Sequence, residues 1–198
     1  MKIIGITGGI GTGKSTILHL LENKYRAYIV EADSLAHTLM QPGMPVYDEL
    51  VSCFGTGILA EDGSIDRGIL GGLVFGDEAK LNRLNQIVHP AVKEHITRDI
   101  FDKRTKGVIK LYVIEAALLI EDGYQAICDE IWYIYTEREE RIRRLMMGRG
   151  GTREKWEAVI EKQSSEEFYM KNSSYIVKND GDFQKTADIV NDLLCQTI

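Results

Sequence analysis

The residues with the clearest chemistry lie near the start of the chain, where Gly8 to Ser15 read GGIGTGKS. This spacing matches the G-x-x-x-x-G-K-[ST] pattern of a nucleotide-binding loop, in which backbone N–H groups surround phosphate oxygens. Lys14 would neutralise the β and γ phosphates of ATP, and Ser15 would offer its hydroxyl to Mg²⁺. The remaining expected contacts to ATP in this loop are Gly8, Gly9, Gly11, Thr12, Gly13 and Thr16.

The flanks of this loop favour nucleotide binding over a plain glycine turn, because a β-branched run precedes it and a helical apolar pattern follows. The loop alone does not separate kinases from GTPases and ATPases. The only Asn-Lys pair, Asn23-Lys24, is followed by Tyr25 and Arg26, so the guanine-reading N-K-x-D segment is missing. A transport-ATPase signature of the L-S-G-G-Q kind is missing too. A kinase of small molecules remains.

Such a kinase needs a carboxylate that accepts the proton of the attacking hydroxyl, and Asp33 is the candidate. It follows a short expected strand, Tyr28 to Val30, and so lies at the carboxyl edge of a parallel sheet together with the phosphate loop. The alternative is that Asp33 only caps a helix that begins at Ser34. Position alone leaves both interpretations open.

Six arginines lie between positions 138 and 153 of this otherwise acidic chain. Arginine suits forked contacts with phosphate. Arg141, Arg144 and Arg149 fall roughly on one side of the expected helix and lead into GRGGT, a plausible hinge for a lid over ATP. The alternative is a solvated basic helix balanced by neighbouring glutamates, and we favour it for Arg138 and Arg143.

Three further residues carry weaker signals. Arg67 could meet an anionic acceptor or pair with Asp66, and His89, which precedes Pro90, could cap or pack at a helix start. Glu115, near the end of an expected strand, could hold Mg²⁺ through water.

The elements that must position these residues predict an α/β fold: an open parallel sheet flanked by helices. Strands are expected at Lys2 to Thr7, Tyr28 to Val30, and within VIKLYVIEA, EIWYIYT and SSYIVKND, and Asp182 is the expected N-cap of a last helix. The middle shows four helical patterns, VYDELVSCF, DRGILGGLVF, AKLNRLNQIV and HPAVKEHITRDIF, the last with Pro90 in its first turn. We expect one domain, 1–198, with a nucleotide-binding core (1–32, 106–136 and 174–198), a helical acceptor-binding insertion (33–105) and a lid (137–173).

Composition narrows the class further. The net charge of −6 argues against binding to nucleic acid or to a membrane surface. The sequence also has no run of 18 apolar residues that could cross a bilayer. The three cysteines show no metal-ligand spacing, and the N-terminus lacks the features of a signal peptide. We expect a cytoplasmic protein that is a monomer or a weak homo-oligomer.

Several segments together resemble one family, the dephospho-coenzyme A kinases. They are GITGGIGTGKST, EADSLAH, FGTGILAEDGSIDRGILGGLVFGD, LNQIVHPAV, ALLIEDG and YIVKNDG, in matching order over nearly the whole chain. The resemblance implies a P-loop kinase that transfers the γ-phosphate of ATP to the ribose 3′-hydroxyl of dephospho-CoA. It also implies Asp33 as catalytic base, Arg67 and His89 in the acceptor-binding region, Arg144 or Arg149 in the lid, and Asn179 near the adenine.

The chain departs from the family pattern at several positions. Ala117 replaces a usual proline, Glu31 replaces the first acid of D-A-D, and Ser173-Ser174 replaces a common Ala-Asp pair. Arg141 stands where glutamine is frequent, and one extra residue separates Arg144 from Arg149. The alternatives are another P-loop kinase, such as one for nucleoside monophosphates, and a regulator that binds ATP without turning it over.

Overall fold

A computed structural model describes residues 1–195. These residues divide into two compact units. The first comprises Met1–Ile29 and the chain from Lys106 onward, and the second comprises Val30–Thr105. The first unit holds the phosphate loop and the arginine-rich helix, and the second holds Asp33, Arg67 and His89.

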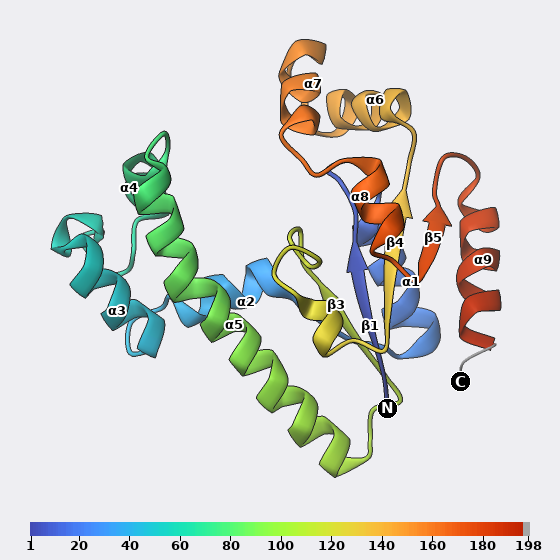
Figure 1. The fold of residues 1–198 in the computed structure, drawn as a ribbon, viewed down its shortest axis with the longest axis horizontal. Coiled ribbons are helices and arrows are strands. Elements are labelled where there is room, and N and C mark those ends of the chain that lie inside the picture. Colours follow the sequence, from blue (N-terminus) through green and yellow to red (C-terminus); the bar gives the residue numbers. More distant parts are fainter. Residues whose placement is uncertain (196–198) are drawn as a thin grey trace. The chain divides into compact units, whose positions relative to one another are not determined.

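The strands form a five-stranded sheet in the order β2-β3-β1-β4-β5 (Figure 1). The strands are β1 (Lys2–Thr7), β2 (Tyr28–Glu31), β3 (Leu111–Glu115), β4 (Glu130–Tyr135) and β5 (Tyr175–Lys178). β1 pairs in parallel with β3 and with β4, and β4 pairs in parallel with β5. The predicted α/β class and the predicted strands are confirmed.

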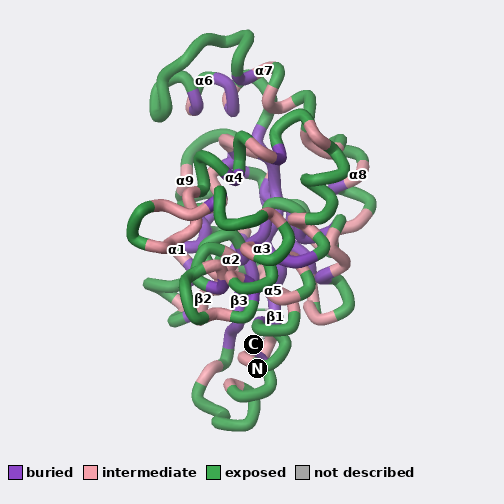
Figure 2. The backbone as a smooth tube through the Cα atoms, turned by 90° about the vertical axis from the view of Figure 1, so that its left-hand side faces the viewer, coloured by how far each residue is buried: buried purple, intermediate pink, exposed green. Residues whose placement is uncertain are grey.

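Alternation of side chains along these strands builds the core of the first unit. Ile4, Ile6, Val113, Trp132 and Ile134 pack on one face with apolar residues of two helices, α1 (Lys14–Tyr25) and α9 (Phe183–Cys195). Figure 2 shows buried residues along the strands and exposed residues in many of the loops. Because the strands are buried and paired, their carboxyl ends form a rigid edge from which the loops project.

Three helices follow β4 in the first unit: α6 (Arg138–Arg149), α7 (Arg153–Glu161) and α8 (Glu166–Lys171). Gly150 and Gly151, between α6 and α7, both adopt positive φ angles, of 65° and 89°. Thr152 and Ser165 cap α7 and α8 through their hydroxyls. The last helix, α9, begins as expected, since the Asp182 carboxylate accepts the N–H of Gln184.

The second unit is helical, with α2 (Ala32–Leu39), α3 (Pro45–Phe54), α4 (Arg67–Val74) and α5 (Glu78–Lys106). One expectation was wrong here. The two patterns around Pro90 form a single helix of 29 residues, so Pro90 lies in its interior rather than its first turn. A buried stripe of Ile87, Val88, Val92, Ile96 and Ile100 runs through the proline. Its burial outweighs the hydrogen bond that Pro90 cannot donate, which is worth about 3 kcal/mol with the associated strain.

Among residues 1–195, no helix is both long and apolar enough to cross a membrane.

Candidate active site

The phosphate loop leads from the end of β1 into α1. Gly11 and Gly13 have φ angles of 82° and 85°, a left-handed conformation that favours glycine. The Thr12 hydroxyl donates to the Gly9 carbonyl at 2.8 Å, which closes the turn. α1 has no side-chain N-cap and no acidic residue in its first turn. Its first amide groups and its positive dipole end therefore suit an anion.

Lys14 is held at the strand end of this loop. Its ammonium donates to the Gly8 carbonyl at 2.8 Å and lies 3.5 Å from a carboxylate oxygen of Glu115. Glu115 is 9% exposed and ends β3, next to β1 in the sheet. This largely shielded pair keeps the ammonium beside the loop, where terminal phosphates would lie.

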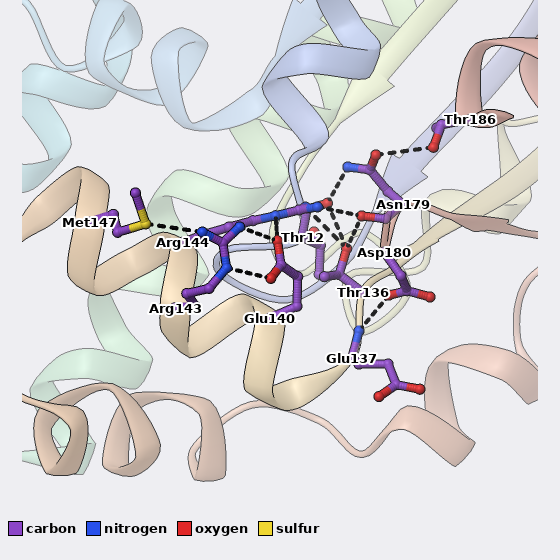
Figure 3. A network of polar contacts seen from close by, with 10 residues as sticks. All are labelled: Thr12, Thr136, Glu137, Glu140, Arg143, Arg144, Met147, Asn179, Asp180 and Thr186. Atoms are coloured by element: carbon purple, nitrogen blue, oxygen red, sulfur yellow. Dashed lines mark hydrogen bonds and ion pairs between the residues drawn. The ribbon is translucent and has the colours of Figure 1, made fainter. Parts of the chain in front are cut away.

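A polar network holds the other end of the loop (Figure 3). The Thr12 carbonyl accepts the Asn179 amide at 2.8 Å and lies 3.1 Å from the Thr136 hydroxyl. Arg144 donates to the Asn179 carbonyl at 2.7 Å and to Glu140 at 2.8 Å. Thr136 and Asn179 are 1% and 5% exposed, so these contacts are shielded from water. Arg144 and Asn179 thus meet the loop near Gly13.

Both the nitrogen and the oxygen of the Asn179 side-chain amide form hydrogen bonds in this network. Its amide oxygen lies 3.1 Å from the Thr186 hydroxyl of α9, while its amide nitrogen binds Thr12. The contact of Asn179 with adenine stays a prediction, and the structure adds a second task for this residue, that of fixing the loop.

Arg141 reaches the opposite end of the loop. Its guanidinium donates to the Ile10 carbonyl at 2.9 Å and to the Gln163 side chain at 2.6 Å. Of the three arginines expected on one side of α6, two therefore reach the loop. Arg149 is exposed, at the last residue of α6, and makes no ion pair with any described residue.

Arg138 and Arg143 belong to surface ion pairs, as we expected. Arg138 pairs with Glu161 at 3.0 Å, and Arg143 binds Glu140 through two nitrogens at 2.6 and 2.7 Å. Glu140 thereby also orients Arg144. The hydrogen bond from Arg143, joined by that from Arg144, lowers the pKa of the Glu140 carboxyl from 4.5 to about 2.

In the second unit, Asp33 lies in the first turn of α2, which begins at Ala32 with Glu31 at its N-cap position. The capping alternative for Asp33 is therefore wrong, since the helix starts before it. The Asp33 carboxylate is exposed and has no hydrogen-bond or ion-pair partner within residues 1–195. It is accessible to a hydroxyl that approaches from solvent.

Contact of Arg67 and His89 with an acceptor stays a prediction, but the local alternatives considered for them in the sequence are not what the structure has. The Asp66 carboxylate caps α4 by accepting the N–H groups of Gly68 and Ile69, and Arg67 instead lies 2.9 Å from a ring nitrogen of His37. Arg67 and His37 line a cavity of about 410 Å³ together with Met40, Gln41, Ser64 and Ile65. His89 is half-buried in the middle of α5, so its expected place at a helix start was wrong.

Comparison with known proteins identifies the relatives of the chain. The model of the dephospho-CoA kinase family matches residues 2–185. The chain belongs to the dephospho-CoA kinase family. The dephospho-CoA kinase of Carboxydothermus hydrogenoformans is 38% identical to it over 98% of this chain and 93% of the relative. The enzyme of that name from Aquifex aeolicus is also 38% identical, over 94% and 92%.

Two solved structures are similar to the chain in fold. TT1252 from Thermus thermophilus superposes with a TM-score of 0.80 at 28% identity, over 100% of this chain and 98% of the other. A shikimate kinase from Bacteroides thetaiotaomicron, 13% identical over 98% of both chains, has a TM-score of 0.59. This second likeness shows that the two chains share a fold.

Sequence reasoning missed three residues that hold the family's phosphate loop here: Thr136, Gln163 and Glu140. Thr136 directly follows β4, and its place at the carboxyl edge of a parallel sheet was a usable signal. Gln163 carried none, because its contact depends on how the α7–α8 connection packs against the loop. Glu140 acts on the loop only through Arg144, to which it is paired at i,i+4 spacing within α6.

Proposed function

We propose that the protein transfers the γ-phosphoryl group of ATP to the ribose 3′-hydroxyl of dephospho-CoA, giving CoA and ADP. Membership of the dephospho-CoA kinase family over residues 2–185 is the observation that carries this function. The preformed phosphate loop supports it, since the P-loop is the part of the fold that binds the donor nucleotide.

Asp33 is the general base of this reaction. The 3′-oxygen of the acceptor attacks the γ-phosphorus, the bond from that phosphorus to the β–γ bridging oxygen breaks, and the hydroxyl proton passes to the Asp33 carboxylate. The exposed position of Asp33, without a described partner, supports this role, because its oxygens are available to the acceptor. Arg67 and His89 belong to the acceptor region of the same unit.

Lys14 and the lid arginines neutralise the charge on the phosphates. Lys14 is already held at Gly8, and Arg144 is fixed by Glu140 and the Asn179 carbonyl. Arg149 has no described partner and is exposed, so it is free to turn towards the transferring phosphoryl group when the lid closes. We therefore assign Arg144 to nucleotide binding and Arg149 to the transition state.

Mg²⁺ fits the donor set at the start of α1. Ser15 is exposed there, and its hydroxyl has no partner among residues 1–195. Mg²⁺ in such kinases takes few protein ligands and several oxygens from phosphate and water. Bound with ATP, the ion would neutralise charge that develops on the phosphates. Glu115 is close enough to Lys14 to act through water in the same region.

The test is ADP formation by purified protein with Mg-ATP and one of four additions: dephospho-CoA, AMP, CMP or no acceptor. We expect ADP and CoA, identified by mass, in the presence of dephospho-CoA alone. Turnover with AMP or CMP instead would identify another P-loop kinase. ATP binding without turnover of any acceptor would identify a regulator, and either result would overturn the proposal.

A further inference from the structure

Arg141 holds a peptide segment of the phosphate loop together with Gln163. The Arg141 side chain donates to the Ile10 carbonyl at 2.9 Å, and the Gln163 amide oxygen accepts the Ile10 N–H at 3.1 Å. Arg141 and Gln163 also bind one another, at 2.6 Å. Both polar groups of Ile10 are therefore fixed by side chains that lie 131 and 153 residues away in the sequence.

The charge of Arg141 has no counter-ion in the described part of the chain. Arg141 is 5% exposed and its two hydrogen-bond acceptors are both neutral. Its neighbours on α6, Arg143 and Arg144, share the carboxylate of Glu140. Burial lowers the pKa of the Arg141 guanidinium, an effect that Tyr133 and Glu166 oppose without an ion pair to Arg141. A buried cation without a direct counter-ion is unfavourable, and this charge lies beside the loop in the free protein.

This charge lies at the end of the loop where the terminal phosphates bind. The lysine of this loop motif reaches the β and γ phosphates, and the Lys14 ammonium is held at the Gly8 carbonyl. Gly9 follows directly, and a side chain at Gly9 would collide with the Arg141 guanidinium and with Gln163. Arg144, in contrast, meets the loop near Gly13.

We propose that Arg141 is a positioning residue for the terminal phosphates of ATP, and that its charge is balanced only when a di- or triphosphate occupies the loop. The inference rests on nucleotide binding at this loop, as the proposed function requires. The arginine adds selectivity for ATP and ADP over AMP.

The test compares Arg141→Gln, which removes the charge, with Arg141→Lys, which keeps it. Arg138→Gln is the matched control, because Arg138 lies on the same helix in an exposed ion pair. Dissociation constants for ATP, ADP and AMP are measured by calorimetry at fixed Mg²⁺ and ionic strength. For Arg141→Gln we expect ATP to bind roughly 10- to 100-fold more weakly than to the wild type. The affinity for ADP should fall by a smaller factor, and the affinity for AMP should stay within about twofold of the wild-type value. The lysine variant should keep the preference for ATP over AMP within about threefold of the wild type.

Thermal unfolding separates this role from a purely structural one. Without nucleotide, Arg141→Gln should melt within a few degrees of the wild type, because the lost charge had no counter-ion, while its stabilisation by ATP should shrink. An equal loss of affinity for all three nucleotides, or none, would overturn the proposal. Should the glutamine variant not fold, the lysine variant tests the proposal instead. Loss of the preference for ATP over AMP in Arg141→Lys would contradict a role for the charge. A wild-type protein that binds none of the nucleotides would overturn the proposed function itself, and this inference with it.

Discussion

The phosphate loop of the first unit and the acceptor residues of the second differ in how far they are organised without a ligand. Loop residues and the side chains around them are bound to one another: Thr12 to Asn179, Ile10 to Arg141, and Lys14 to Gly8. In the second unit, Asp33 and Arg67 are exposed. Because these residues are already ordered without a ligand, less conformational entropy is lost when ATP binds. Asp33, the proposed base, has no partner among residues 1–195, and Arg67 contacts a ring nitrogen of His37, so the proposed acceptor residues are less fixed than the loop.

The sharpest way to test this contrast is to change Asp33 to asparagine. We expect turnover to fall by roughly 10²- to 10⁴-fold, the usual worth of general base catalysis, while ATP affinity stays near that of the wild type. The measurement is the initial rate of ADP release with dephospho-CoA, beside calorimetry with ATP. Glu49→Gln, which alters an exposed carboxylate of α3 in the same unit, is the control. Near-normal turnover in Asp33→Asn would remove the base assignment.

A change of Lys14 to alanine should affect both binding and rate. Removal of the ammonium leaves the terminal phosphates without their main cation, and we expect kcat/KM for ATP to drop by about 10²- to 10³-fold, with weaker ATP binding. Lys24→Ala is the control, because Lys24 lies in the last turn of the same helix. Unchanged ATP affinity and turnover would contradict the assignment of the loop.

A methyl group at Gly9 tests how tightly the loop is packed. Alanine at this position would strike Arg141 and Gln163, so both must shift. We expect a loss of about 1–3 kcal/mol in the free energy of unfolding, measured in urea, and roughly tenfold weaker ATP binding. Gly71→Ala serves as control, since nothing lies within 4 Å of a methyl group there. If Gly9→Ala were as stable as Gly71→Ala, Arg141 and Gln163 would be able to move aside at little cost, and the loop would not be tightly packed.

The contrast between the two units also explains what the sequence could predict. The loop motif is contiguous, and its flanking strand and helix have local periodicities, so Gly8 to Thr16 and the segments that form strands could be predicted. Arg141 and Gln163 reach the loop from 131 and 153 residues away, and no local pattern encodes such contacts.

In the helical unit, a local sequence signal led to a wrong prediction. Pro90 has a strong preference for the first turn of a helix, which predicted a helix start at that point. The apolar residues Val88 and Val92 on either side are both buried and keep one helical face continuous across the proline. Tertiary burial decided the outcome, and the place of His89 changed with it.

The smallest effect should come from Glu140→Gln, which loosens Arg144 without touching the loop itself. Arg143 and Arg144 hold the pKa of the Glu140 carboxyl at about 2, below its ordinary value of 4.5. The charged form is thus favoured in the folded state, and the pair contributes stability above about pH 4.5 that is lost as the pH falls towards 2. Because Glu140 is partly exposed, solvent screening limits this contribution to about 1 kcal/mol.

Urea unfolding of wild type and Glu140→Gln at a series of pH values measures this contribution. We expect the difference in free energy of unfolding to be constant between pH 6 and pH 8 and to narrow below about pH 4.5. ATP affinity at pH 7 should fall only about two- to fivefold, since Arg144 keeps its bond to the Asn179 carbonyl. A difference that does not change with pH would mean that the glutamate acts through shape rather than charge. Arg144 would then owe its position to two neutral groups, the Asn179 carbonyl and the Thr136 hydroxyl.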